Sequence, residues 1–282
     1  MTVKLTVSKA NITTSYYHHL RSGLALAFIL QLVFLSSATA QVLNVKAPNF
    51  VPDRPGYADS TSSVDPGHWH LELGGSWLPS SDRTVSALVR YGLKYGWELR
   101  LMTPTLTQVL PYQDVEGNEI NPELAVGGTL FGAKWAKHWS RLEFSLVTMV
   151  ALPITGTSKA LTPDPLVSFT SQISHALNER ISAGLAFRYA LHDGVLHGQE
   201  VAYGEELSSL VGLMGSLTWS DVGWSVYTQA GAEVFKDVLT PLVGTGITFR
   251  ISQGSQVDLS LDAPLSSDGV APRYMLGFTL SW

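Results

Sequence analysis

The chain has 282 residues, a formal net charge of −5 and no cysteine, and only 15% of its residues are charged. The absence of cysteine excludes disulfides, cysteine-based zinc sites, iron–sulfur clusters and a thiol nucleophile. The acidic balance argues against a nucleic-acid partner, which would require a basic face.

Residues 1–40 have the three-part layout of a secretory signal peptide. Their charged residues are all basic, and an apolar run from Leu24 to Leu35 precedes small residues up to Ala40. The run is shorter than the roughly 20 apolar residues that a spanning helix needs, which favours a cleaved signal over a membrane anchor. We therefore predict cleavage after Ala40 and export of residues 41–282.

Residues 41–65 are polar, are interrupted by prolines and match no strand pattern. Because they precede the first predicted strand, they either extend into the periplasm or fold into the lumen of a barrel as a plug. In the second case we expect Asp53 and Arg54 to pair with lumen charges. The prolines on either side of them favour an extended backbone.

From residue 66 to residue 282 apolar and polar side chains alternate with a period of two, which is typical of β-strands. Trp97, Leu99 and Leu101, for example, alternate with Glu98 and Arg100. The pattern predicts strands at about residues 67–77, 84–92, 95–103, 123–136, 140–152, 165–176, 180–191, 206–219, 222–235, 242–251, 256–263 and 272–282.

The predicted connections alternate in length. Those after the even-numbered strands are short turns, whereas those after the odd-numbered strands are mostly longer, and the largest runs from about Pro104 to Pro122. This asymmetry is typical of outer-membrane barrels, and only a closed barrel or a helix satisfies backbone hydrogen bonds in hydrocarbon. The sequence therefore predicts an all-β, antiparallel up-and-down transmembrane β-barrel of about 12 strands (roughly 10–14) in the outer membrane of a Gram-negative cell.

The last predicted strand places an apolar residue at every second position and ends on an aromatic residue. This pattern resembles the C-terminal β-signal by which outer-membrane proteins are recognised for assembly. We therefore expect outer-membrane lipid and the barrel-assembly machinery as partners, the latter reading Tyr274, Leu276, Phe278, Leu280 and Trp282.

Six segments resemble a known family. They are Pro52–Pro55, Asp59–Ser60, Val64–Glu72, Leu88–Leu93, Trp97–Arg100 and Leu152–Gly156. These segments are similar to the exported barrels of the meta-pathway of phenol degradation family, although Pro52 stands where a threonine is usual. The resemblance implies an outer-membrane barrel that passes small molecules, aromatic ones among them.

The inward positions of the predicted barrel carry charges of both signs. They either form ion-paired networks that brace the barrel or line a polar path for a permeant molecule. Because the charges balance, we expect weak ion selectivity. The residues predicted to line the lumen are Glu72, Arg90, Glu98, Arg100, Arg141, Glu143, Arg188, Glu233, Arg250, Asp258, Asp262 and Arg273.

No catalytic, cofactor-binding or metal-binding arrangement stands out. His68 and His70 would share one strand face, but no third ligand at a metal-binding spacing is nearby. The nucleophile-elbow, P-loop and dinucleotide motifs are absent. We expect no cofactor and favour passive transport of small hydrophobic or aromatic molecules. The alternatives are a lipid-modifying outer-membrane enzyme, a structural or adhesive barrel, and a soluble secreted β protein.

Overall fold

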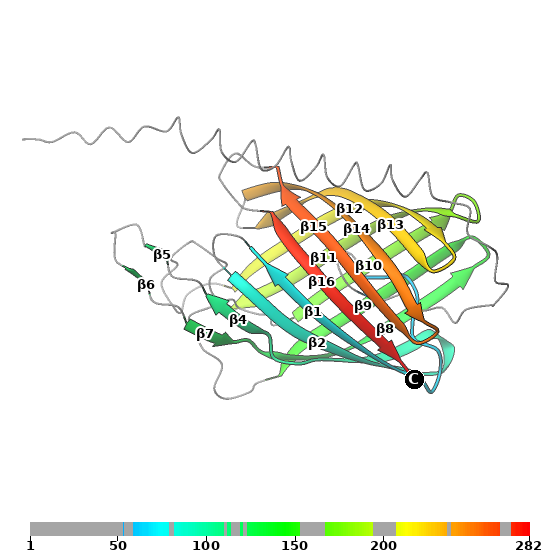
Figure 1. Cartoon of the computed structure of the whole chain (residues 1–282), viewed down its shortest axis with the longest axis horizontal. Coiled ribbons are helices and arrows are strands. Elements are labelled where there is room, and N and C mark those ends of the chain that lie inside the picture. Colours follow the sequence, from blue (N-terminus) through cyan, green and yellow to red (C-terminus); the bar gives the residue numbers. More distant parts are fainter. Residues whose placement is uncertain are drawn as a thin grey trace, which may run out of the picture. The chain divides into compact units, whose positions relative to one another are not determined.

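The computed structural model describes Asp53 and residues 59–78, 82–109, 112–113, 119–120, 123–152, 167–193, 207–235, 238–265 and 272–282. Residues 59–282 of this set contain an antiparallel β-barrel (Figure 1). Its elements are β1 (Trp69–Trp77), β2 (Asp82–Gly92), the 3-10 turn η1 (Lys94–Gly96), β3 (Trp97–Met102), β4 (Leu106–Val109), β5 (Tyr112–Gln113), β6 (Glu119–Ile120), β7 (Glu123–Val126), β8 (Thr129–Trp139), β9 (Leu142–Leu152), β10 (Val167–Ala176), β11 (Ile181–Asp193), β12 (Leu207–Asp221), β13 (Trp224–Phe235), β14 (Val238–Ser252), β15 (Ser255–Pro264) and β16 (Arg273–Ser281).

The barrel closes because β1 pairs with β16 on one side and with β2 on the other. At the seam, the backbones of Trp69 and Trp282 exchange two hydrogen bonds of 2.9 and 3.1 Å. The short strands β3 and β4 both pair with β2, and their partners on the other side are β8 and β7. β3 and β4 therefore act as one barrel strand with an interruption, and β7 and β8 act as the next barrel strand in the same way. The described residues thus confirm the predicted antiparallel barrel of twelve strands.

The prediction of one long loop from Pro104 to Pro122 is partly wrong, because this stretch contains strand residues. The strand breaks around Pro104, which has no N–H to donate to a ladder, and it resumes as β4. Thr107 then faces the interior and Leu106 the exterior, so the alternation of β3 continues beyond the break with its phase shifted. Further along, β5 and β6 pair with each other and form a small separate sheet.

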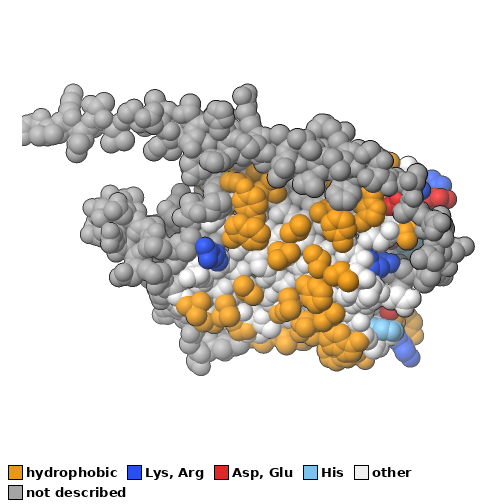
Figure 2. Space-filling view, in the orientation of Figure 1, with side chains coloured by type: hydrophobic (Ala, Val, Ile, Leu, Met, Phe, Trp, Pro, Cys, Tyr) orange, Lys and Arg blue, Asp and Glu red, His pale blue; other side chains and the backbone are white. Residues whose placement is uncertain are grey.

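The outer face of the barrel is apolar and the inner face is polar. On β3, Leu99 and Leu101 are 39% and 40% exposed, whereas Glu98 and Arg100 between and beside them are buried. Figure 2 shows hydrophobic side chains spread over the visible strands and charged groups toward the two ends. An apolar outer face and a polar inner face are what a barrel surrounded by lipid requires.

Aromatic residues gather at the end that carries the short turns. Trp69 contacts Tyr91 with ring centroids 4.5 Å apart, and Trp219 contacts Trp224 at 4.7 Å. Such rings are favoured where hydrocarbon meets the polar interface.

Among the described residues, no helix is both long and apolar enough to cross a membrane.

Candidate functional site

The candidate site is the interior of the barrel. All but one of the residues predicted to line the lumen lie on the strand face that also carries the buried side chains. Exposure differs among them: Glu72, Glu98 and Asp258 are fully buried, whereas Arg273 is exposed. The residues on this inner face are Glu72, Arg90, Glu98, Arg100, Glu143, Arg188, Glu233, Arg250, Asp258, Asp262 and Arg273.

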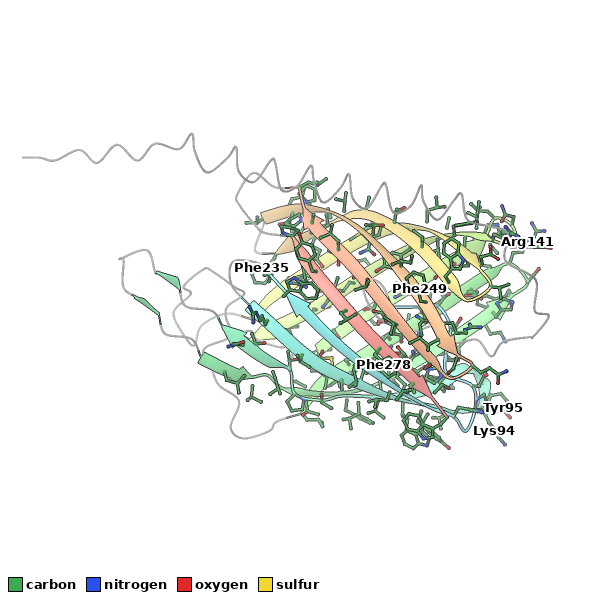
Figure 3. All side chains as sticks on the ribbon, in the orientation of Figure 1. Lys94, Tyr95, Arg141, Phe235, Phe249 and Phe278 are labelled. Carbon is green, nitrogen blue, oxygen red and sulfur yellow. The ribbon has the colours of Figure 1, made fainter. Side chains whose placement is uncertain are left out.

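Arg141 is the exception, and its assignment to the lumen is wrong. β8 ends at Trp139 and β9 begins at Leu142, so Arg141 falls in the two-residue turn between them and has no inward position. Its side chain is exposed. Figure 3 shows it at the same end of the barrel as Lys94 and Tyr95 of η1.

An ionic cluster lies inside the barrel toward the short-turn end. Arg90 is at its centre: its Nε and Nη2 donate to Glu98 at 2.7 and 2.8 Å, and its Nη1 donates to Glu72. Because a buried charge is costly without a partner, mutual pairing is what allows these groups to occupy the interior. The members of the ionic cluster, each 5% exposed or less, are Asp53, Glu72, Arg90, Glu98, Arg100 and Lys134.

Asp53 lies outside the strands, yet it is the most highly paired carboxylate of the cluster. It contacts Lys134 at 2.8 Å, Arg100 at 2.7 Å and Arg90 at 3.3 Å. Burial alone would raise the pKa of the Asp53 carboxyl, but the charges of Arg90, Lys134 and Arg100 outweigh it and hold that pKa well below its usual range. Asp53 is therefore ionised and anchors its segment among the inward side chains of β2, β3 and β8.

Residues 59–66 continue along the inside of the barrel. Ser60 donates to Asp53 through its hydroxyl at 2.6 Å, and its carbonyl accepts from Ser145 at 3.1 Å. The Val64 N–H donates to Glu98 at 2.9 Å, and Val64 is 1% exposed. A Cβ on Gly92 would meet the carbonyl oxygens of Val64 and Asp65. We call Asp53 and residues 59–66 the inner segment.

A cavity of about 360 Å³ adjoins the ionic cluster, and Asp53, Asp59 and Arg100 line its edge. Its other walls come from the inner faces of the strands and are of two kinds. The apolar wall consists of Leu88, Met102, Leu130, Val147 and Met149. The polar lining includes Ser76, Thr84, Ser86, Ser168, Thr170, Arg188, Asp258 and Arg273.

Comparison with solved structures agrees with this architecture. The KdgM porin superimposes with a TM-score of 0.51 at 9% identity, over 76% of this chain and 99% of the porin. An outer membrane channel from Pseudomonas putida F1 gives a TM-score of 0.51 at 13% identity, over 81% of this chain and 99% of the channel. The chain has the fold of outer-membrane channels. No family model and no curated protein matches the sequence.

Among the interior residues of this channel fold that the sequence did not predict are Lys134, Ser60 and Val64. Lys134 could have been found, because it lies between Ala133 and Trp135 on the opposite face of a strand. Ser60 and Val64 carried no such signal, since their burial depends on the inner segment folding back over the strands. Arg54, expected to act beside Asp53, lies outside the described residues.

Proposed function

We propose that this chain is an outer-membrane channel that lets small amphipathic molecules, aromatic ones among them, diffuse through its lumen. The observation that carries this proposal is the interior cavity, which has an apolar wall and a polar lining inside a closed barrel with an apolar exterior. A cavity with a few polar groups on an apolar wall suits a molecule with both kinds of surface. The resemblance to the meta-pathway of phenol degradation family favours aromatic permeants.

We further propose that residues 41–65 plug the lumen on the short-turn side, which faces the periplasm in barrels of this kind. The support is the set of contacts made by the inner segment: Asp53 pairs with Arg90, Arg100 and Lys134, and Val64 is buried against Glu98. Passage between the cavity and the periplasm would then require the inner segment to move.

Planar-bilayer conductance of refolded residues 41–282 tests both proposals, with heat-modifiable gel mobility to show that the barrel has formed. We expect discrete conductance steps that become larger when residues 41–60 are deleted. Equal steps in the two forms would contradict the plug and leave the channel standing. A folded barrel that gives no steps in either form would contradict the channel.

A further inference from the structure

The apolar wall of the cavity is a continuous surface across four neighbouring barrel strands. Leu88, Met102 and Leu130 are successive cross-strand partners on β2, β3 and β8, so their side chains form one row. On β9, Val147 and Met149 lie diagonally beside this row, opposite Lys134 and Gly132, and pack with Leu130 in one buried cluster. Leu130, Val147 and Met149 pack against one another, and Met102 packs against them. Leu88 is 4% exposed. A flat apolar ring or a short alkyl chain would find a complementary surface here.

An arginine lies on each side of this wall at the same strand distance. Arg188 is on β11, two strands beyond β9, and Thr170 of β10 stands between it and Val147 in one cross-strand row. Arg273 is on β16, two strands before β2, and β1 contributes the small inward residues Gly74 and Ser76 between them. Both arginines line the cavity, and neither forms an ion pair with any described residue.

The acids of the cavity lining are already engaged or buried. Asp53 is held by three cations, and Asp59 pairs with Arg100 at 3.4 Å. Asp258 is fully buried. Arg188 is half-buried and Arg273 exposed, so the charge offered at the surface of the cavity is that of the arginines.

Two further acids lie near the arginines on the neighbouring strands. Glu233 of β13 interacts electrostatically with both Arg188 and Arg273. Asp262 of β15 is the cross-strand partner of Arg273. Asp262 accepts a hydrogen bond from Gln229 at 2.8 Å. Within the described part of the chain neither carboxylate forms an ion pair with an arginine, so these acids leave both guanidinium groups without an ion-pair partner.

We propose that the cavity is a binding site for a small aromatic carboxylate. Its ring would lie on the apolar wall, and its carboxylate would accept paired hydrogen bonds from Arg188 or Arg273, because guanidinium matches carboxylate geometry. The volume lies within the range of about 300–1,000 Å³ typical of small-molecule sites. This inference rests on the proposed function, since it names the class of permeant that the channel would hold.

Equilibrium binding to refolded residues 41–282 in detergent micelles tests the site, by calorimetry against a micelle blank. Benzoate is compared with benzyl alcohol, which keeps the ring without the charge, and with acetate, which keeps the charge without the ring. We expect benzoate to bind at least about tenfold more tightly than either compound. A difference of this size from benzyl alcohol corresponds to one charge-assisted hydrogen-bond pair, and the difference from acetate corresponds to one ring contact. Arg188→Gln and Arg273→Gln should each raise the Kd for benzoate severalfold, and Met149→Gln should do so through the ring.

Arg83→Gln is the matched control, because Arg83 lies exposed on the outward face of β2. Arg188→Lys should retain part of the affinity, since lysine keeps the charge and loses the paired hydrogen bonds. Gel mobility establishes that each variant has folded. Equal binding of benzyl alcohol and benzoate, wild-type affinity in the Arg188→Gln/Arg273→Gln double variant, or no benzoate binding above the blank would each overturn the proposal. Binding without conductance would instead contradict only the channel.

Discussion

Lys134 and Asp53 form an ion pair of 2.8 Å although they are 81 residues apart in the sequence. Both side chains are fully buried, one on a barrel strand and the other in the inner segment. Together with Arg90 and Arg100 this pair attaches the inner segment to the wall, and none of these contacts is made between neighbouring residues in the chain. The ionic cluster therefore holds the inner segment in place, and under the proposed function it would keep the lumen closed on the short-turn side.

Asp53→Asn should release the inner segment. The amide leaves Arg90, Arg100 and Lys134 with the carboxylates of Glu72, Glu98 and the less buried Asp59. Breaking a buried ion pair from one side typically costs about 3–5 kcal/mol. We expect larger single-channel conductance steps than in the wild type, with barrel closure unchanged on heat-modifiable gels. Asp65→Asn is the control, because Asp65 belongs to the same segment but is exposed. Identical conductance in both variants would show that the segment stays in place without its central carboxylate.

The stability supplied by Asp53 should depend on pH in a defined direction. The pKa of Asp53 in the folded chain lies well below its ordinary value of 3.8, because Arg90, Lys134 and Arg100 outweigh the effect of burial. A depressed folded pKa stabilises the fold fully above the unfolded value, and this contribution is lost as the pH falls through the folded pKa. The difference in unfolding temperature between the wild type and Asp53→Asn should therefore be constant from about pH 8 to 5 and shrink below about 4. A difference that has already vanished at pH 6 would mean that folded Asp53 carries a proton.

Gly92→Val should displace the inner segment through a steric clash, with the ion pairs of Asp53 left unchanged. A Cβ at position 92 would collide with the carbonyl oxygens of Val64 and Asp65, and these backbone atoms can move away only if the segment shifts. The chain has no cysteine, so a Val64→Cys reporter can be labelled at a single site. We expect slow maleimide labelling in the parent and rapid labelling after Gly92→Val. Gly75→Ala is the matched control, because its Cβ would meet only the Thr84 carbonyl at an ordinary 3.7 Å.

The barrel could be predicted from the sequence because each strand is encoded by the alternation of neighbouring residues. Alternation along β3, where Leu99 and Leu101 face lipid and Glu98 and Arg100 face the lumen, is repeated with little change from strand to strand. The interior was less predictable because its contacts join distant segments. Nothing in the alternation placed Val64 against Glu98 or Ser60 against Ser145, since residues 59–66 have no strand period. Arg141 was misplaced for a local reason: the predicted strand began at residue 140 and β9 begins at Leu142, so a predicted inward position falls in the turn.

Trp282 should matter for assembly as well as for closure. Its backbone exchanges two hydrogen bonds with Trp69 at the seam between β1 and β16. Deleting Trp282 removes both bonds and the terminal ring, whereas Trp282→Ala removes only the ring. If the pattern of the last strand is an assembly signal, both changes should lower the yield of membrane-inserted protein in cells, and Trp282→Ala should still refold normally in detergent. Normal insertion of Trp282→Ala in cells would leave backbone closure as the only role of this residue.

Ion selectivity should distinguish the two arginines that the sequence placed together in the lumen. Arg188 lines the cavity, whereas Arg141 lies exposed in a turn, where salt screens its charge over about 10 Å at 0.1 M. Arg188→Gln should therefore shift the reversal potential in a salt gradient toward cation preference, because it removes a positive charge from the conducting path. Arg141→Gln is the same chemical change outside the lumen, and we expect its reversal potential to match that of the wild type. A shift in Arg141→Gln as large as that in Arg188→Gln would place the selective part of the channel at the turns instead of in the cavity.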